Sequence, residues 1–179
     1  MHKDTDFKNP PGRRIGALAI VRDREGSVLL VKKAYKEGKS WGLPGGAAHA
    51  NEPPHEAWAR EIRQETGLDR TPGRLLAVDY VPYSEVSGSA EGVNFVFDGG
   101  MAKDAETLLP EYEGEEPEII GIQFVPLYKL SDFVTPLTEK RIRFATPLTE
   151  KRIRFAVGIL EDDFPSSVYL AEGRSLTYG

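Results

Sequence analysis

The chain has 179 residues, no cysteine and a formal net charge of −5. This length suits one domain with a substantial core, and the absence of cysteine excludes disulfide frameworks and thiolate metal sites. The mildly acidic charge argues against sequence-independent nucleic-acid binding. Because no apolar run could span a bilayer or serve as a signal peptide, we expect a cytoplasmic protein without a membrane partner.

The pattern of apolar residues predicts mainly strands in the first two thirds of the chain. Residues 1–13 are polar, and we expect them to be disordered or loosely attached to a domain at 14–161, with a tail at 162–179. Apolar runs separated by turn residues predict a β-hairpin and three further strands, at 15–21 with 28–31, 75–81, 93–97 and 119–125. The segment 127–133 is expected to be a linker. Strands mixed with helices predict an α/β fold in which a mixed sheet is covered on both faces.

A helix is predicted between the first two groups of strands, from about residue 54 to Thr66. Pro53 and Pro54 suit its first turn, where backbone N–H groups have no intrahelical partner. Gly67 suits a left-handed C-terminal cap. Glu52 precedes a proline and should therefore be extended.

Carboxylates crowd one face of this helix. Glu61 and Glu65 are one turn apart beside Trp58 and Ile62, which should face the core. Two such carboxylates repel, and each raises the pKa of the other unless a cation neutralises them. On an arbitrary helix the pair would form a solvated charged surface, but hard oxygen ligands at this spacing also suit Mg²⁺ or Mn²⁺. Arg60 should point elsewhere, within reach of Glu56, and Gln64 should lie at the edge of the acidic face.

Residues 46–68 resemble the Nudix box, the 23-residue motif of the Nudix hydrolases. The matching positions are Gly46, Glu52, Arg60, Glu61, Ile62, Glu65, Gly67 and Leu68, and the preceding residues 41–45 resemble the usual lead-in. Gln64 departs from the motif, because the family normally has glutamate there. The resemblance implies an α/β/α sandwich with a C-terminal helix and a Mg²⁺-dependent pyrophosphohydrolase.

The resemblance also implies roles for individual residues. Glu61 and Glu65 would be metal ligands, and Gln64 would offer only a carbonyl oxygen. Glu52 and Arg60 would support these ligands. The general base would be Glu61 or a residue of the acidic connection at 103–118, where Glu116 ranks before Glu113 and Glu115 because it lies near the following strand.

The substrate is less well defined by the sequence. The Gly45–Gly46 turn would let backbone approach a metal or phosphate closely. Trp41 and Tyr83 are candidates for stacking on a nucleobase. Pro82, 14 residues after Leu68, is similar to a proline in the ADP-ribose branch, so ADP-ribose or a nucleotide sugar is favoured slightly over a nucleoside triphosphate. A catalytically weak or inactive nucleotide-binding module remains the alternative, with Gln64 as its main support.

An eleven-residue segment occurs twice without change, at 135–145 (the first copy) and at 146–156 (the second copy). Each copy begins Thr-Pro, a typical helix start. Because Pro147 would interrupt a continuous helix, we expect the second copy and residues 157–160 to form the long terminal helix, and the first copy to form a separate short helix or a displaced segment. We expect no catalytic role for the repeat. The repeat and the acidic connection are candidate parts of a homodimer interface.

Overall fold

The computed structural model describes residues 12–34, 41–85, 88, 90–103, 108, 110, 117–156, 168–171 and 174–175. Its strands are β1 (Arg14–Arg22), β2 (Val28–Lys33), β3 (Trp41–Gly42), β4 (Gly45–Ala47), β5 (Leu75–Val81), β6 (Gly92–Met101), β7 (Ile119–Val125), β8 (Val168–Ala171) and β9 (Arg174–Ser175). Its helices are α1 (Pro54–Thr66), the 3₁₀ turn η1 (Leu127–Lys129), α2 (Leu130–Phe133) and α3 (Pro136–Ala156).

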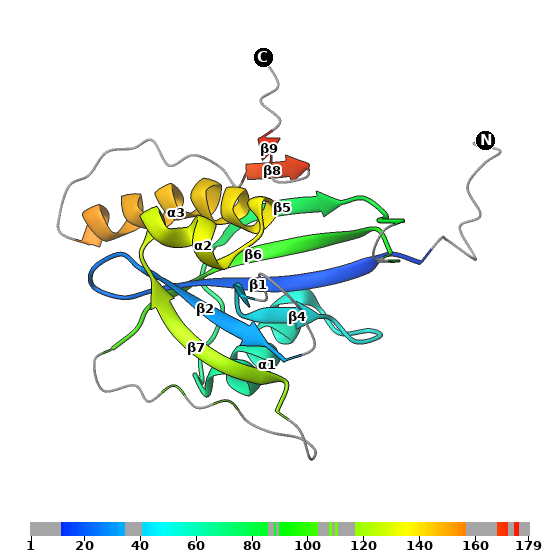
Figure 1. Ribbon diagram of the computed structural model, residues 1–179, viewed down its shortest axis with the longest axis horizontal. Coiled ribbons are helices and arrows are strands. Elements are labelled where there is room, and N and C mark those ends of the chain that lie inside the picture. Colours follow the sequence, from blue (N-terminus) through cyan, green and yellow to red (C-terminus); the bar gives the residue numbers. More distant parts are fainter. Residues whose placement is uncertain are drawn as a thin grey trace.

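A mixed sheet separates the helices into two layers. Its strand order is β3-β2-β1-β6-β5-β8-β9, with β4 joined to β1 and β7 joined to β2. The pair β1–β6 and the pair β5–β8 are parallel, whereas the other pairs are antiparallel. Helix α1 lies on one face of the sheet, and α2 and α3 lie on the other (Figure 1). The α/β/α sandwich expected from the sequence is therefore confirmed.

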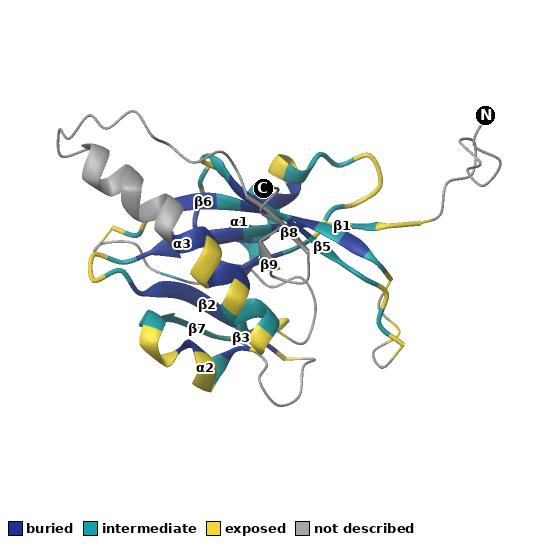
Figure 2. Cartoon of the chain, turned by 90° about the horizontal axis from the view of Figure 1, so that it is seen from above, coloured by how far each residue is buried: buried dark blue, intermediate teal, exposed yellow. Residues whose placement is uncertain are grey.

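Strand β1 supplies residues to both layers, because successive side chains of a strand point to opposite faces. Ala17, Ala19 and Val21 join the apolar cluster against α1. Leu18 and Ile20 belong with the cluster on the α3 side. Figure 2 shows buried residues concentrated in the central strands β1, β2 and β6. Strand β1 is therefore packed on both faces. Strand β4, which contains the glycine turn described below, pairs with it.

The hairpin predicted between β1 and β2 is paired only next to its turn. The two strands pair antiparallel at Arg22 and Val28 and then take different partners. Strand β1 continues along β6 and β4, while β2 pairs with β7 and β3. The apolar runs correctly predicted that both are strands, but such runs contain no information about which strand lies beside which.

The helix boundaries predicted for α1 are confirmed, and so is its cap. Gly67 has a φ of 73°, and its N–H donates to the carbonyl of Arg63. Trp58 and Ile62 are fully buried, as expected for the core face. Strand β6, however, extends through Asp98, Gly99 and Gly100 to Met101, beyond the end at 97 that the sequence predicted.

Two expectations about the C-terminal third are wrong. The predicted linker at 127–133 forms η1 and α2. The two copies of the repeat form one helix, α3, rather than two. An eleven-residue shift rotates a helix by only about 20° beyond three full turns, so the second copy continues in phase with the first. Pro147 therefore costs α3 one backbone hydrogen bond without ending it.

The start of α3 follows the predicted pattern. The hydroxyl of Thr135 accepts a hydrogen bond from the N–H of Thr138, which caps the first turn. Ile142 and Ala145, both in the first copy, are buried against the sheet. Residues 157–160, which the sequence assigned to the same helix, lie outside the described residues. Within the described part of the chain, no helix is long and apolar enough to cross a membrane.

Candidate functional site

The glycine turn Gly45–Gly46 belongs to β4, which lies beside the buried strand β1 and pairs with it. Leu18 pairs with Gly45 and Ala17 pairs with Gly46 in the β1–β4 ladder. Gly45 has a φ of 130°, and a Cβ there would collide with the carbonyl of Ala17. A Cβ on Gly46 would overlap the carboxylate of Glu61. Gly45 thus allows β4 to approach β1, and Gly46 allows it to approach the acidic face of α1.

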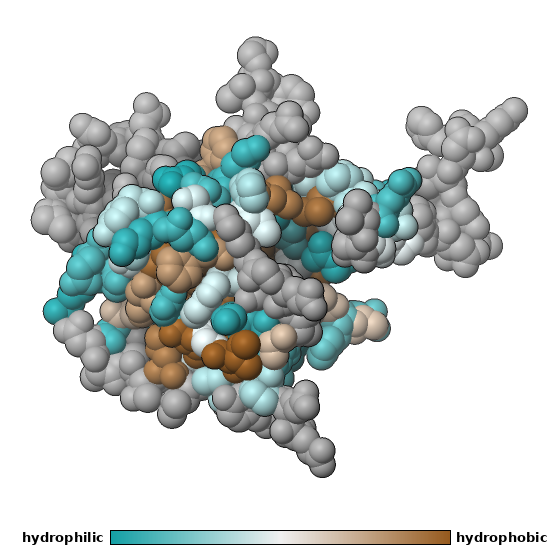
Figure 3. Space-filling view, viewed as in Figure 1, coloured by the Kyte–Doolittle hydropathy of each residue, from teal (hydrophilic) through white to brown (hydrophobic). Residues whose placement is uncertain are grey.

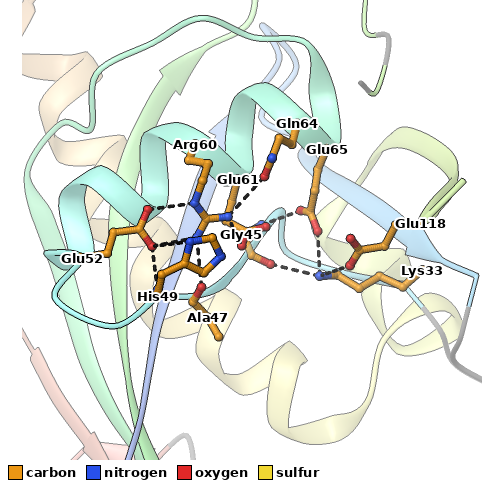
Figure 4. Close-up of polar contacts among 10 residues, drawn as sticks. All are labelled: Lys33, Gly45, Ala47, His49, Glu52, Arg60, Glu61, Gln64, Glu65 and Glu118. Carbon is orange, nitrogen blue, oxygen red and sulfur yellow. Dashed lines mark hydrogen bonds and ion pairs between the residues drawn. The ribbon is translucent and has the colours of Figure 1, made fainter. Parts of the chain in front are cut away.

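Glu65 lies at the centre of this arrangement and is only 2% exposed. Its Oε2 accepts a hydrogen bond of 2.6 Å from the N–H of Gly45. Its Oε1 lies 2.6 Å from the Nζ of Lys33, which comes from the end of β2. The same ammonium donates to the carbonyl of Gly45 at 3.1 Å and lies 3.7 Å from Oε1 of Glu118. These contacts are drawn in Figure 4.

Burial raises the pKa of Glu65 to about 7, although Lys33 and the Gly45 N–H pull that pKa down and Glu61 raises it slightly. Removal from water disfavours the charged carboxylate more than one ammonium can compensate. A carboxyl group with a pKa near neutrality in a functional-site candidate is the kind of perturbed residue that catalytic centres contain.

Arg60 organises the opposite end of the acidic face, and its expected pairing with Glu56 is wrong. Its guanidinium binds Glu52 through two contacts of 2.8 Å, Glu61 at 2.7 Å and Gln64 at 3.2 Å, and it also donates to the carbonyl of Ala47. Figure 4 shows these partners gathered around the one side chain. Helical spacing alone suggested a neighbour one turn away, but a bidentate carboxylate offered by the preceding loop is the better partner.

The hydrogen bonds between Arg60 and Glu52 shift the pKa of both side chains. The hydrogen bond from Arg60 lowers the pKa of Glu52 to about 2, with a further contribution from the backbone N–H of His49. The hydrogen bond to Glu52 raises the pKa of Arg60. Glu52 therefore stays ionised and fixes the guanidinium, which in turn positions Glu61.

The remaining predicted site residues are spread more widely. Trp41 packs edge-on against Phe133, with ring centroids 5.9 Å apart, and contributes to the apolar cluster. Tyr83 is 59% exposed and lies beyond the end of β5. His49, in the loop before α1, is exposed. Glu113, Glu115 and Glu116, the loop candidates for the general base, lie outside the described residues.

Sequence reasoning missed Lys33 and Glu118. Lys33 is the second of two lysines that end β2 after an apolar run, and of the two it is Lys33 that is buried. A lysine continuing a buried apolar strand was the signal that could have identified it. Glu118 was noted as one of several acids in a connection, but its position immediately before β7 brings it toward Lys33. Contacts between β2 and β7 cannot be inferred from a local pattern.

A cavity of about 370 Å³ adjoins the glycine turn on the α3 side of the sheet. Gly45 and Gly46 line one end, and Arg14, Asn94, Thr138 and Arg141 provide most of its other polar lining. Its volume is at the lower end of the range for small-molecule sites. Figure 3 shows the molecular face that carries α3, where hydrophilic and hydrophobic residues are interspersed.

The donor set beside the turn fits a divalent cation. The Lys33 ammonium already occupies a position among three oxygen atoms, from Glu65, Gly45 and Glu118. These oxygen atoms thus already neutralise one positive charge, that of the Lys33 ammonium. Among the described residues, no three His, Cys, Asp or Glu side chains form a metal-binding group. A metal here would thus need backbone, amide or non-protein ligands besides the carboxylates.

The chain matches the model of the NUDIX domain over residues 12–146. It is 44% identical over 55 residues to the putative ADP-ribose pyrophosphatase YjhB of Bacillus subtilis (strain 168), a match that covers 31% of this chain and 26% of the relative. It is 32% identical over 101 residues to an ADP-ribose pyrophosphatase of Methanocaldococcus jannaschii, which covers 50% of this chain and 60% of that relative. The chain thus spans less than two thirds of either relative.

Solved structures show the same fold. The NUDIX domain of Shewanella oneidensis NrtR, solved as a complex with ADP ribose, has a TM-score of 0.63 and 15% sequence identity. The match covers 84% of this chain and 94% of that one. The elements that hold the glycine turn and the acidic helix therefore belong to an architecture shared well beyond recognisable sequence similarity.

Proposed function

The chain belongs to the Nudix family, and from this premise we propose that it is a Mg²⁺-dependent pyrophosphohydrolase. Its substrate would be a nucleoside diphosphate linked to another group, with ADP-ribose and nucleotide sugars ahead of nucleoside triphosphates. The observation that carries the proposal is the contact between the Gly45–Gly46 turn and the carboxylates of Glu61 and Glu65. Two relatives named as ADP-ribose pyrophosphatases support the order of candidate substrates.

Glu61 and Glu65 are the proposed metal ligands, with the carbonyl oxygens of Gly45 and Gln64 available to assist them. When bound, Mg²⁺ would supply positive charge opposite the diphosphate and make an attacking water more acidic. Mn²⁺ suits the same oxygen donors. Gln64 removes one negative charge from the family pattern, so we expect weaker metal binding or one metal fewer.

The other residues of the site have supporting roles in this proposal. Arg60 holds the Glu61 carboxylate from one side, while Glu52 holds Arg60. The N–H of Gly45 donates to Glu65, and the carbonyl of Gly45 accepts a hydrogen bond from the Lys33 ammonium. Lys33 is placed to exchange its contact with Glu65 for one with a phosphate oxygen once a metal takes up the carboxylate. Glu61 is the described candidate for the general base, and Glu116 remains the candidate outside the described residues.

A substrate panel with Mg²⁺ tests the proposed reaction. ADP-ribose, UDP-glucose and ATP would be incubated with the protein, and released nucleoside monophosphate would be measured by chromatography. We expect turnover of at least one compound and its loss in Glu65→Gln, with the fold retained in circular dichroism. Matched samples in EDTA provide the metal control.

The alternative is a nucleotide-binding module without useful catalysis. The observation that favours it is Gln64, where the family pattern has a carboxylate. Its expected result is a rise in melting temperature with the same compounds but no product. That outcome would overturn the enzymatic proposal while retaining the family fold as a binding site.

A further inference from the structure

A polar row crosses the face of the sheet that lies under α3. Gly16 of β1 pairs with Asn94 of β6, and Asn94 pairs with Asp79 of β5. Asn94 is 5% exposed and Asp79 is fully buried. Their neighbours along the same face, including Leu18 and Val96, belong to the apolar cluster. Burying polar groups among apolar ones costs free energy unless each finds a partner. The partners of Asp79 and Asn94 therefore decide which hydrogen-bonding groups this row leaves for a ligand.

Asp79 is neutralised by a residue of α3. The Nε of Arg141 donates to Oδ2 of Asp79 at 2.7 Å, and the guanidinium makes a second contact with the same oxygen. Both side chains are nearly inaccessible to solvent. This pair fixes the first turns of α3 over the sheet, and Arg141 lines the cavity. Asp79 behind it offsets the charge of Arg141.

Asn94 is oriented by Arg14. Its Oδ1 accepts a hydrogen bond of 3.3 Å from Nη1 of Arg14, two positions along β1 from Gly16. Because a guanidinium can only donate, this contact leaves the amide nitrogen of Asn94 as a donor. The position depends on Gly16, since a Cβ there would overlap the Asn94 amide oxygen. Arg14 and Asn94 therefore offer hydrogen-bond donors at the same end of the cavity.

The described lining of the cavity contains no aspartate or glutamate, although it contains Arg14, Lys33 and Arg141. Lys33 is paired with Glu65 and Arg141 with Asp79. Among the described residues, no carboxylate pairs with Arg14, whose side chain contacts Asn94. The uncompensated positive charge of the cavity thus lies at the Arg14 end.

This end is displaced along β1 from the glycine turn. Gly45 pairs with Leu18, whereas Asn94 pairs with Gly16, and the Arg14 guanidinium reaches Asn94. Two residues of strand span roughly 7 Å, so both hydrogen-bond donors lie about that far along β1 from Gly45. A group bonded to a diphosphate at Gly45 and Gly46 would reach Asn94 and Arg14, whereas the diphosphate itself would remain beside the turn.

We propose that Arg14 and Asn94 form a specificity subsite for the group attached to the diphosphate, and that this subsite selects an anionic, oxygen-rich group. The chemistry is a carboxylate or a phosphate carried by a sugar, which accepts hydrogen bonds from both side chains and offsets the charge of Arg14. The inference rests on the proposed function, because it places the diphosphate at the glycine turn. It adds a preference that the acidic helix does not determine.

Binding to matched ligands tests the subsite separately from turnover. UDP-glucose and UDP-glucuronate differ by one carboxylate, and ADP-ribose and 2′-phospho-ADP-ribose differ by one phosphate. Dissociation constants would be measured by calorimetry with the wild-type protein and Ca²⁺, which takes the same hard oxygen ligands as Mg²⁺, and chromatography would check that the compounds stay intact. We expect about tenfold tighter binding of the anionic member of at least one pair, the effect of one charge-assisted hydrogen bond. The pair that responds identifies the source of the negative charge.

Substitutions then assign the preference to the two residues. Arg14→Met should remove the preference and leave affinity for the neutral member within about twofold, as expected when one contact is lost. Asn94→Asp is nearly isosteric and would pair with Arg14, so it should also abolish the preference. Arg13→Met is the matched control, since Arg13 is half-exposed, contacts Glu91 and is not among the residues that line the cavity.

Each alternative outcome has a distinct meaning. Equal binding within both wild-type pairs, or equal losses for both members in Arg14→Met, would overturn the subsite. Turnover without the preference would overturn the subsite alone, whereas a preference without turnover would overturn only the enzymatic proposal. Absence of binding by all four compounds would overturn both. Melting temperatures of the variants show whether a loss reflects unfolding.

Discussion

Lys33 holds its ammonium 2.6 Å from the carboxylate of Glu65, and both groups are almost completely buried. The pair joins the end of β2 to the acidic face of α1. It places a positive charge of the protein itself beside a proposed metal ligand. Stability, proton binding and metal binding should therefore depend on one another at this point.

Replacing Lys33 with methionine should destabilise the protein without metal. The buried Glu65 carboxylate would lose its partner, a change that typically costs about 3 kcal/mol. Mg²⁺ should restore a larger part of the stability in Lys33→Met than it adds to the wild type. Urea unfolding at pH 8 in EDTA and in Mg²⁺ measures this difference. Lys32→Met is the control on the same strand, and equal effects of the two substitutions would contradict the prediction.

The stability of the metal-free protein should fall between pH 4.5 and 7. The folded state raises the pKa of Glu65 from 4.5 to about 7, so it holds a proton more tightly than the unfolded chain. Raising the pH through this window favours unfolding, by about 3 kcal/mol in total, and the effect levels off above pH 7. Unfolding curves in EDTA across this range would detect it, and the slope should vanish in Glu65→Gln.

Glu52 should produce the opposite dependence in a different window. Its folded pKa is lowered from 4.5 to about 2, so its contribution is present above pH 4.5 and is lost as the pH falls toward 2. Glu52→Gln should reduce the loss of stability in this acidic range and leave the slope above pH 4.5 unchanged. A Glu52→Gln protein that unfolds in acid like the wild type would contradict this assignment.

Arg60 and Glu52 should act as one unit in positioning Glu61. Either Arg60→Met or Glu52→Gln is expected to lower kcat, because each removes the bidentate contact that orients the guanidinium. The double variant should lose little more than the worse single variant, which corresponds to a coupling energy of about 1–3 kcal/mol. Independent additive losses would show that the pair does not act through Glu61. Steady-state kinetics with Mg²⁺ on the four proteins of the cycle provides the measurement.

Restoring the family residue at position 64 should strengthen metal binding. Gln64→Glu adds a carboxylate on the acidic face while keeping an oxygen for the hydrogen bond from Arg60. The Mg²⁺ concentration needed for half-maximal activity should fall several-fold, since an added opposite charge favours a bound cation. Gln64→Met provides the opposite control, because it removes the amide oxygen. An unchanged Mg²⁺ requirement in both variants would show that position 64 does not contact the metal.

Removing one copy of the repeat should preserve both the fold and the activity. Deleting 135–145 or deleting 146–156 produces the same chain, because the two copies are identical. The single remaining copy contains the residues that now occupy the cavity wall and the core, including Arg141, Ile142 and Ala145. Specific activity within about twofold of the parent is expected. A large loss in a folded deletion protein would assign a catalytic contribution to the repeat.

The local features of the site were predictable from sequence because they depend on near neighbours. The helix cap at Gly67, the buried Trp58 and Ile62 and the shared face of Glu61 and Glu65 all follow from helical geometry. The partner of Arg60 was not predictable in this way, since Glu52 comes from a loop whose path depends on the sheet.

Long-range pairing explains the other differences. Lys33 meets Glu65 only because β2 and α1 pack on either side of the glycine turn, and Asn94 lies beside Gly16 only because β1 and β6 are parallel neighbours. The expectation that α3 breaks at Pro147 was wrong, because it gave too much weight to one lost backbone hydrogen bond. The repeat keeps the helix in phase, and α3 continues through the proline. The two long-range contacts are not encoded within a single window of sequence, whereas the phase of the repeat is a local feature that the expectation of a break undervalued.

The continuous helix α3 has a consequence for how this chain can change over generations. Recombination between two stretches that encode the same eleven residues can lose or add a unit without creating a new junction sequence. Each event would alter the length of the helix by about 16 Å, close to a whole number of turns. Ile142 and Ala145, which are buried against the sheet, belong to the first unit, so a gain or loss of one unit leaves an identical pair at the start of the helix.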